Sequence, residues 1–279
     1  MTTFDRILAA ARERGGGVGA FNVILLEHAE AITAGAERAG TPVVLQISEN
    51  CVRYHGGLAP VTCASLEIAR RAAVPVLVHL DHIEDPGLVR EGVALGVHSV
   101  MYDGSRLPYE ENVRSTREIV TLCHDAGIAV EAELGEVGGK DGVHAPGART
   151  DPGEAREFVA ATGVDALAVA VGTSHAMRSR VATVDRELIG RLRETVPVPL
   201  VLHGSSGLSD DELRAAVRSG MTKINISTHL NGLFTRAVKR FLDDNPQVVD
   251  PRKYLRPGRD AVADEIERLL VLLDRANRE

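Results

Sequence analysis

Val76-Leu77-Val78-His79-Leu80-Asp81-His82 is a short apolar run that ends in residues able to bind protons or metal ions. The run is rich in β-branched residues, too short for a helix, preceded by a proline and followed by an Asp-Pro-Gly turn signal. Because side chains alternate along an extended chain, we expect His79 and Asp81 on one face and Leu80 and His82 on the other. A capped strand end with incidental polar residues is the simpler interpretation. The pattern predicts a buried strand with candidate catalytic groups at its tip.

The same unit, a helical pattern followed by a strand pattern, recurs along the whole chain. Strand patterns occupy residues 18–23, 42–48, 76–82, 97–102, 128–134, 164–171, 197–202 and 222–228. Helical patterns occupy residues 4–14, 26–39, 61–73, 88–95, 110–126, 154–162, 186–195 and 210–219. Strands separated by helices predict parallel pairing through right-handed crossovers, because parallel neighbours need a connection of that length.

This repetition predicts an α/β fold, a (β/α)₈ TIM barrel with a C-terminal helical extension, as a single domain over residues 1–279. An open, doubly wound sheet is the alternative. Polar residues favour the barrel, because a barrel brings all strand C-termini to one mouth, whereas an open sheet scatters them. These polar residues stand at or just beyond strand ends: Asn22, Ser48, Asp81, His82, Asp103, Glu133, His175, His203 and Asn225.

The composition excludes several classes of partner. The chain is 44% hydrophobic and 25% charged, with a formal net charge of -7, which gives no electrostatic reason to expect nucleic acid or an anionic membrane. Its three cysteines form no Cys-x-x-Cys pair, so a reducing cytoplasm is the expected compartment. No apolar run approaches the roughly 20 residues of a membrane span, and the N-terminus has no secretory signal. We therefore expect a cytoplasmic protein with a small-molecule partner.

Three of the strand-end residues are histidines from three different strands: His82, His175 and His203. Converging neutral imidazoles are the usual way to hold zinc with positions left open for substrate. A single histidine at a strand end is more often a satisfied polar residue, but three in equivalent positions favour a catalytic metal site. The other seven histidines lack this register, with His79 the nearest exception.

The chain also resembles a known family, the class II, metal-dependent ketose-bisphosphate aldolases, from about residue 19 to residue 259. The motifs that carry the resemblance are Leu80-Asp81-His82, Ser99-Val100-Met101-Tyr102-Asp103-Gly104-Ser105, Glu131-Ala132-Glu133-Leu134-Gly135, Thr150-Asp151-Pro152, Gly172-Thr173-Ser174-His175, His203-Gly204-Ser205-Ser206-Gly207 and Lys223-Ile224-Asn225-Ile226.

The resemblance implies one catalytic Zn²⁺, with a monovalent cation as a further candidate. It would make His82, His175 and His203 the zinc ligands, Glu133 an alternative metal contact, and Asp81 the catalytic acid/base. Cleavage of a phosphorylated ketose to dihydroxyacetone phosphate needs both a Lewis acid at the carbonyl and a base at the C4 hydroxyl. A lysine Schiff base is the competing aldolase strategy, and Lys223 is the one lysine on a predicted strand.

Small and polar residues at the ends of the last two strands suggest a phosphate site. The predicted substrate-binding residues are Asn22, Ser48, Gly204, Ser205, Ser206, Asn225, Ser227, Thr228 and Arg259. A plain tight turn at 204–207 is the alternative, with Arg178 or Arg180 then carrying the phosphate. Arg259 lies in a basic segment that in the family reaches a neighbouring subunit; a solvated C-terminal face is the other interpretation.

The departures from the family pattern leave the substrate open. The glycine-rich loop at 138–142 is short and carries Lys140 or Asp141 where the family usually has a glutamate, and Ala176 replaces a usual glycine. Fructose 1,6-bisphosphate and tagatose 1,6-bisphosphate are the substrate candidates, and the family suggests a homodimer or homotetramer. A member that has lost catalysis and serves as a metal- and sugar-phosphate-binding subunit is the second hypothesis.

Overall fold

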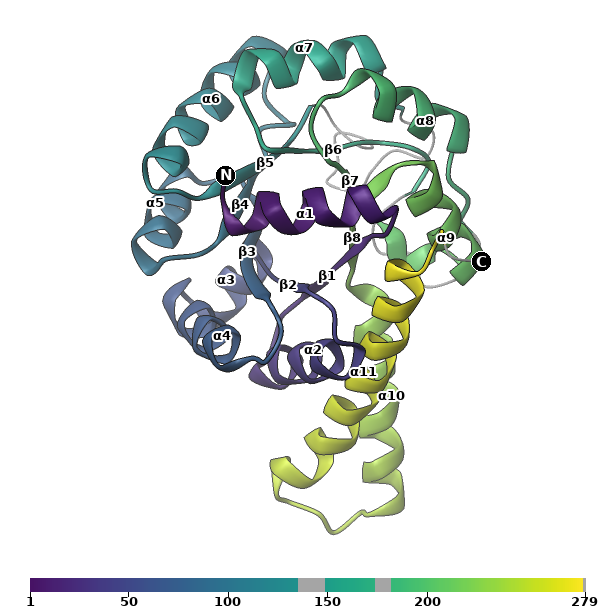
Figure 1. Ribbon diagram of the computed structural model, residues 1–279. Coiled ribbons are helices and arrows are strands. Elements are labelled where there is room, and N and C mark those ends of the chain that lie inside the picture. Colours follow the sequence, from purple (N-terminus) through teal and green to yellow (C-terminus); the bar gives the residue numbers. More distant parts are fainter. Residues whose placement is uncertain (135–148, 174–181, 278–279) are drawn as a thin grey trace.

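The protein folds as a closed barrel of eight parallel strands surrounded by helices (Figure 1). The structure is a computed structural model that describes residues 1–134, 149–173 and 182–277. The strands pair in sequence order, and β1 pairs with β8 to close the barrel. The strands are β1 Val18–Asn22, β2 Val43–Ser48, β3 Val76–Ile83, β4 Ser99–Tyr102, β5 Ala129–Glu133, β6 Ala166–Ala168, β7 Leu200–Leu202 and β8 Met221–Ile226.

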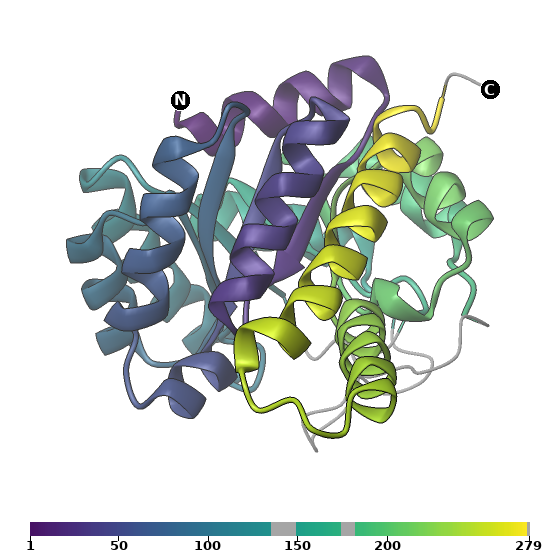
Figure 2. The same cartoon turned by 90° about the horizontal axis from the view of Figure 1, so that it is seen from below.

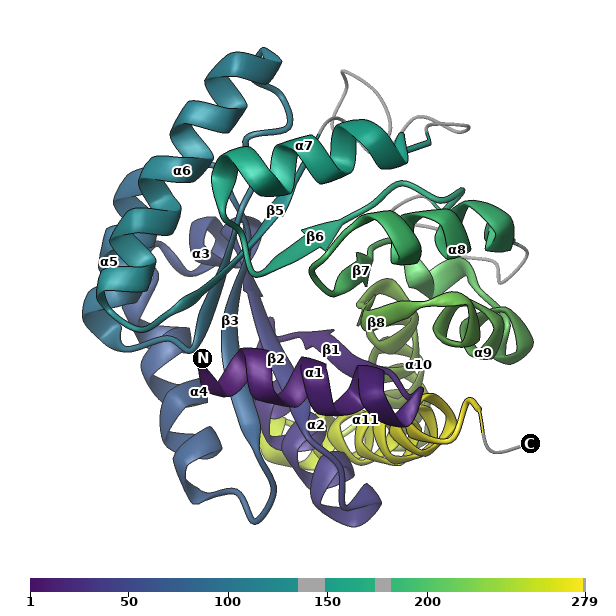
Figure 3. The same cartoon turned by 45° about the horizontal axis from the view of Figure 1, so that its top comes forward.

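Helices form the outer layer and cap one end of the barrel (Figure 3). In the described part of the chain they are α1 Thr3–Arg14, α2 Leu26–Ala39, α3 Glu49–His55, α4 Ala59–Arg71, α5 Pro86–Leu95, α6 Tyr109–Asp125, α7 Pro152–Thr162, α8 Arg186–Thr195, α9 Asp210–Ser219, α10 Thr228–Asp244 and α11 Pro251–Asp274, with a short 3₁₀ helix at Ser205–Gly207. None of them combines the length and apolar character that a membrane crossing requires.

The TIM barrel and its C-terminal helical extension are confirmed. The open-sheet alternative is wrong, because β8 returns to β1. The α10–α11 hairpin projects beyond the barrel in Figure 1, yet α11 also packs against α2 and β1 and so takes a place in the outer ring. The C-terminal extension therefore contributes a helix, α11, to the outer layer of the barrel.

Several boundaries differ from those predicted. β6 and β7 are only three residues long, although apolar patterns covered 164–171 and 197–202. Burial explains the longer pattern around β6, since Val164 and residues 169–171 are also buried, whereas before β7 Pro197 is exposed and residues 198–199 are half-buried. The helix α3 was missed, because Ser48 ends a strand and at the same time caps this helix.

Two hydrophobic cores hold the layers together. One lies between the strands and the outer helices, and the smaller one lies inside the barrel. The helix α1 closes that inner core at the N-terminal end of the strands, and Figure 2 shows it across the end of the barrel. Its residues Phe4, Leu8 and Ala11 are fully buried in the inner core. At the opposite end of the barrel, where the strands end, the side chains are polar.

Candidate metal centre

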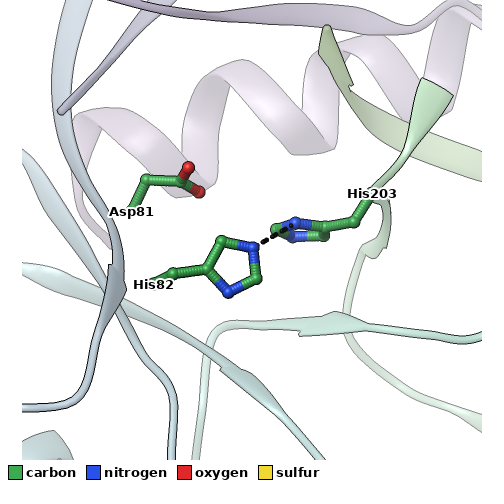
Figure 4. Close-up of side chains that lie close together, drawn as sticks. All are labelled: Asp81, His82 and His203. Atoms are coloured by element: carbon green, nitrogen blue, oxygen red, sulfur yellow. Dashed lines mark hydrogen bonds between the residues drawn. The ribbon is translucent and has the colours of Figure 1, made fainter. Parts of the chain in front are cut away.

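The strand C-termini bring a set of polar side chains together at the open end of the barrel. Asp81 and His82 come from β3, Glu133 from β5, and His203 follows β7 directly. Figure 4 shows Asp81 and His82 facing His203. All of these side chains except His82 are nearly inaccessible to solvent. The convergence required by a metal site is therefore present in the described residues.

The alternation predicted for His82 is wrong, because β3 carries a bulge. Leu80 pairs with Val100 but Ile83 pairs with Tyr102, so β3 has one residue more than β4 between these pairs. His82 takes a left-handed φ of 49°, the single positive φ of a non-glycine residue in the described chain. The bulge turns the His82 side chain to the same side as Asp81.

Hydrogen bonds fix the orientation of both imidazoles. The Nδ1 atom of His82 lies 2.8 Å from Asp103 Oδ2, and the Nε2 atom of His203 lies 3.0 Å from Glu131 Oε1. Carboxylates only accept hydrogen bonds, so each of these ring nitrogens carries the proton. The other two nitrogens, His82 Nε2 and His203 Nδ1, face each other at 2.9 Å.

Negative charge surrounds the point where these two nitrogens meet. Burial opposes the charged form of His82, but the carboxylates of Asp81, Asp103 and Glu133 outweigh it and raise the pKa of His82 to about 10. Burial also opposes ionisation of Asp103, yet hydrogen bonds from His82 and Ser105 hold the pKa of that carboxyl well below its usual range. A proton or a metal cation on His82 Nε2 is therefore strongly favoured.

Two overlapping groups of side chains could each hold a divalent ion. The potential ligand atoms of Asp81, His82 and His203 lie within 4.8 Å of one another, and so do those of His82, Asp103 and Glu133. Mixed imidazole and carboxylate donors suit zinc. In addition, Asp81 Oδ1 is buried without a hydrogen-bond partner among the described residues, which a bound ligand would relieve. The residues present fit a metal centre.

Asp81 is oriented from the opposite side by two amides. The Nδ2 atom of Asn22 donates to Asp81 Oδ2 at 3.2 Å, and Gln46 Nε2 donates to Asn22 Oδ1 at 3.4 Å. One carboxylate oxygen is thus held, and the other remains available to a substrate. Asn22 was predicted to bind substrate, and its side chain reaches this carboxylate.

The predicted phosphate residues meet at the junction of β8 and α10. The left-handed φ of 70° at Gly204 starts the 3₁₀ turn, and Ser206 Oγ accepts a hydrogen bond from the Ser227 amide at 3.2 Å. Thr228 opens α10, whose N-terminus has no side-chain cap. Uncapped amides at a helix N-terminus can bind an anion.

Other predicted residues have different surroundings. The Ser205 hydroxyl is buried and donates to Leu202 O at 3.2 Å, and the amide of Asn225 lies 3.2 Å from His203 Nε2. Ser48 accepts from the Cys51 amide. Arg259 pairs with Glu30 at 3.0 Å on the outer surface of the barrel, so its contact with substrate stays a prediction.

Some predicted residues lie outside the described residues: His175, Ala176, Arg178, Arg180, and the loop at 138–142 with Lys140 and Asp141. Two residues of the described site were given no role from the sequence. Asp103 stood in the strand-end register, and Glu131 stands two residues before Glu133 on the same strand. The period of two along β5 could have indicated that both glutamates face the barrel interior.

Comparisons with known proteins agree with this fold. A family model described as fructose-bisphosphate aldolase class-II matches residues 2–278. The YdjI aldolase from Escherichia coli K12 is 31% identical, with a TM-score of 0.84 over 99% of this chain and 98% of that one. A Coccidioides immitis protein described as a candidate fructose-1,6-bisphosphate aldolase is 29% identical, with a TM-score of 0.86 over 98% and 96% of the two chains.

The geometry predicts that His203→Ala loses tight zinc binding, because it removes one of the two facing imidazoles. Metal analysis of the purified variant after dialysis measures this directly. The control is His124→Ala, which removes an exposed histidine that pairs with Asp165 on the outer surface and should keep a full zinc equivalent. A full equivalent in His203→Ala would rule out this residue as a ligand.

Proposed function

The chain belongs to the class II fructose-bisphosphate aldolase family, and on that premise we propose that it is a zinc-dependent aldehyde lyase. It would reversibly cleave a phosphorylated ketose to dihydroxyacetone phosphate and an aldehyde. The observation that carries the proposal is the meeting of His82, His203 and Asp81 at the barrel mouth. Release of triose phosphate from a ketose bisphosphate, followed with a coupling enzyme, tests the proposal.

His82 and His203 would hold the ion together with His175, while Glu133 offers an alternative contact through the second group of ligand atoms. When bound, the ion supplies a Lewis acid that polarises the ketose carbonyl. The bond from His203 to Glu131 and the bond from His82 to Asp103 keep the two imidazoles aimed at the site.

Asp81 would accept the C4 hydroxyl proton as the bond between C3 and C4 breaks, and return it in the direction of synthesis. The Asn22 amide holds one oxygen of this carboxylate, so the other can face the substrate hydroxyl. The Asp81 side chain is nearly inaccessible to solvent in this position. This built environment favours catalysis over the alternative of a binding-only family member.

The competing Schiff-base strategy has less support. Lys223 is fully buried, and its Nζ lies 2.9 Å from Glu131 Oε2. A nucleophilic lysine must be neutral and reach the substrate carbonyl. An ammonium held by a carboxylate inside the barrel meets neither requirement.

We also propose that the substrate is of the fructose 1,6-bisphosphate or tagatose 1,6-bisphosphate type. Gly204, Ser206 and Thr228 would hold one phosphate at the N-terminus of α10, with Asn225 beside the metal ligands. The free thiols of all three cysteines accord with a cytoplasmic enzyme. A homodimer or homotetramer, as in the family, would bring Arg259 toward a neighbouring subunit.

For Asp81→Ala we expect zinc content to be retained and kcat to fall by at least about 100-fold, the lower range for a positioned general base. Steady-state kinetics with one ketose bisphosphate and metal analysis on the same sample provide the two readouts. Nearly unchanged turnover would show that another group is the base. Loss of zinc would instead make Asp81 part of the metal site.

For Ser206→Asp we expect a sharp rise in KM at constant zinc content, because a carboxylate would stand against the substrate phosphate. Thr121→Asp is the matched control: it adds the same charge at an exposed position near the C-terminal end of α6, away from the mouth. An unchanged KM in Ser206→Asp, at fixed ionic strength, would contradict the assignment and favour Arg178 or Arg180.

A further inference from the structure

A buried ion pair crosses the interior of the barrel below the metal centre. Glu131 of β5 and Lys223 of β8 are both 0% exposed, and Lys223 Nζ lies 2.9 Å from Glu131 Oε2. Taking two charges out of water is costly, and apolar residues of similar volume often serve stability equally well. The pair therefore calls for an explanation beyond stability of the barrel.

The second oxygen of Glu131 connects this pair to the metal centre. Glu131 Oε1 lies 3.0 Å from His203 Nε2, which donates to it. The proton on Nε2 leaves Nδ1 as the nitrogen that faces His82 at 2.9 Å. The position of Glu131 thus decides which ring nitrogen of His203 is presented at the barrel mouth.

Lys223 is the cation that holds Glu131 in that position. The other neighbour of Oε2 is His79, whose Nε2 is 3.8 Å away. At that distance His79 Nε2 makes no hydrogen bond to Glu131. Its Nδ1 is engaged with Ser99 Oγ at 2.8 Å. Within the described residues, no second cation is paired with Glu131.

We propose that Lys223 is a positioning residue of the metal centre, acting through Glu131 to present His203 Nδ1 to the metal. The inference rests on the proposed function, since it concerns the affinity of the same site. Without the ammonium, the buried carboxylate loses its counter-charge and leaves the orientation that His203 requires. Loss of such an outer partner typically lowers metal affinity by about 10- to 100-fold.

The test compares zinc affinity, by competition with a chelator at fixed pH, in wild type, Lys223→Met, Glu131→Gln and the double variant. Methionine keeps much of the lysine volume without the charge. We expect Lys223→Met to bind zinc about 10- to 100-fold more weakly. Because Lys223 acts through Glu131, the double variant should bind zinc almost as tightly as Glu131→Gln alone.

Ser99→Ala is the control for a general disturbance of the barrel interior, because Ser99 is fully buried and bonds to His79 but not to the ion pair. It should lower thermal stability while leaving zinc affinity near the wild-type value. Equal zinc affinity in Lys223→Met and wild type overturns the inference and leaves the metal centre standing. A wild-type chain that binds no divalent ion overturns both.

A second readout is measured on the wild-type chain and needs a variant only to assign the signals. In zinc-loaded wild type with ¹⁵N-labelled histidine, we expect His203 to carry a hydrogen-bonded proton on Nε2 and to bind metal through Nδ1. His203→Ala identifies its signals by their disappearance. Coordination through Nε2 overturns the inference, because that nitrogen could not then donate to Glu131.

Discussion

The site depends on one local backbone feature, the left-handed conformation of His82 within β3. This conformation costs an L-residue about 1–2 kcal/mol. The cost is offset where the imidazole gains its hydrogen bond to Asp103 and its place beside His203. The extra residue in β3 lets Asp81 and His82, neighbours in sequence, act on the same side. A regular strand would bury one of them under the outer helices.

The interior of the barrel is layered along its axis. At the closed end, α1 and apolar side chains of the strands fill the space. Phe4 of α1 stacks on His79, which lies beside the pair of Glu131 and Lys223. His203 and the strand-end carboxylates form the open end. The charged side chains of the interior therefore lie next to the polar residues at the open end, and the apolar layer at the closed end provides rigidity.

The sequence predicted the fold well because alternating helical and strand patterns have few arrangements that bury both faces of a sheet. The strand-end register also predicted Asp81, His82, His203 and Glu133 as neighbours. It could not predict the bulge, since one added residue leaves no signature in the pattern of apolar side chains. The sequence also could not pair Asp103 with His82, or Glu131 with His203, because these residues lie on different strands and their contacts depend on the register between the strands.

The central claim is that a metal ion, held by strand-end histidines, is required for cleavage of a phosphorylated ketose. The most direct measurement is triose phosphate release before chelation, after exhaustive chelation, and after zinc is restored. The account predicts activity that is lost on chelation, returns with zinc, and is unaffected when ketose and borohydride are added together. Activity that survives chelation but is lost on borohydride treatment would contradict it and point to a lysine Schiff base.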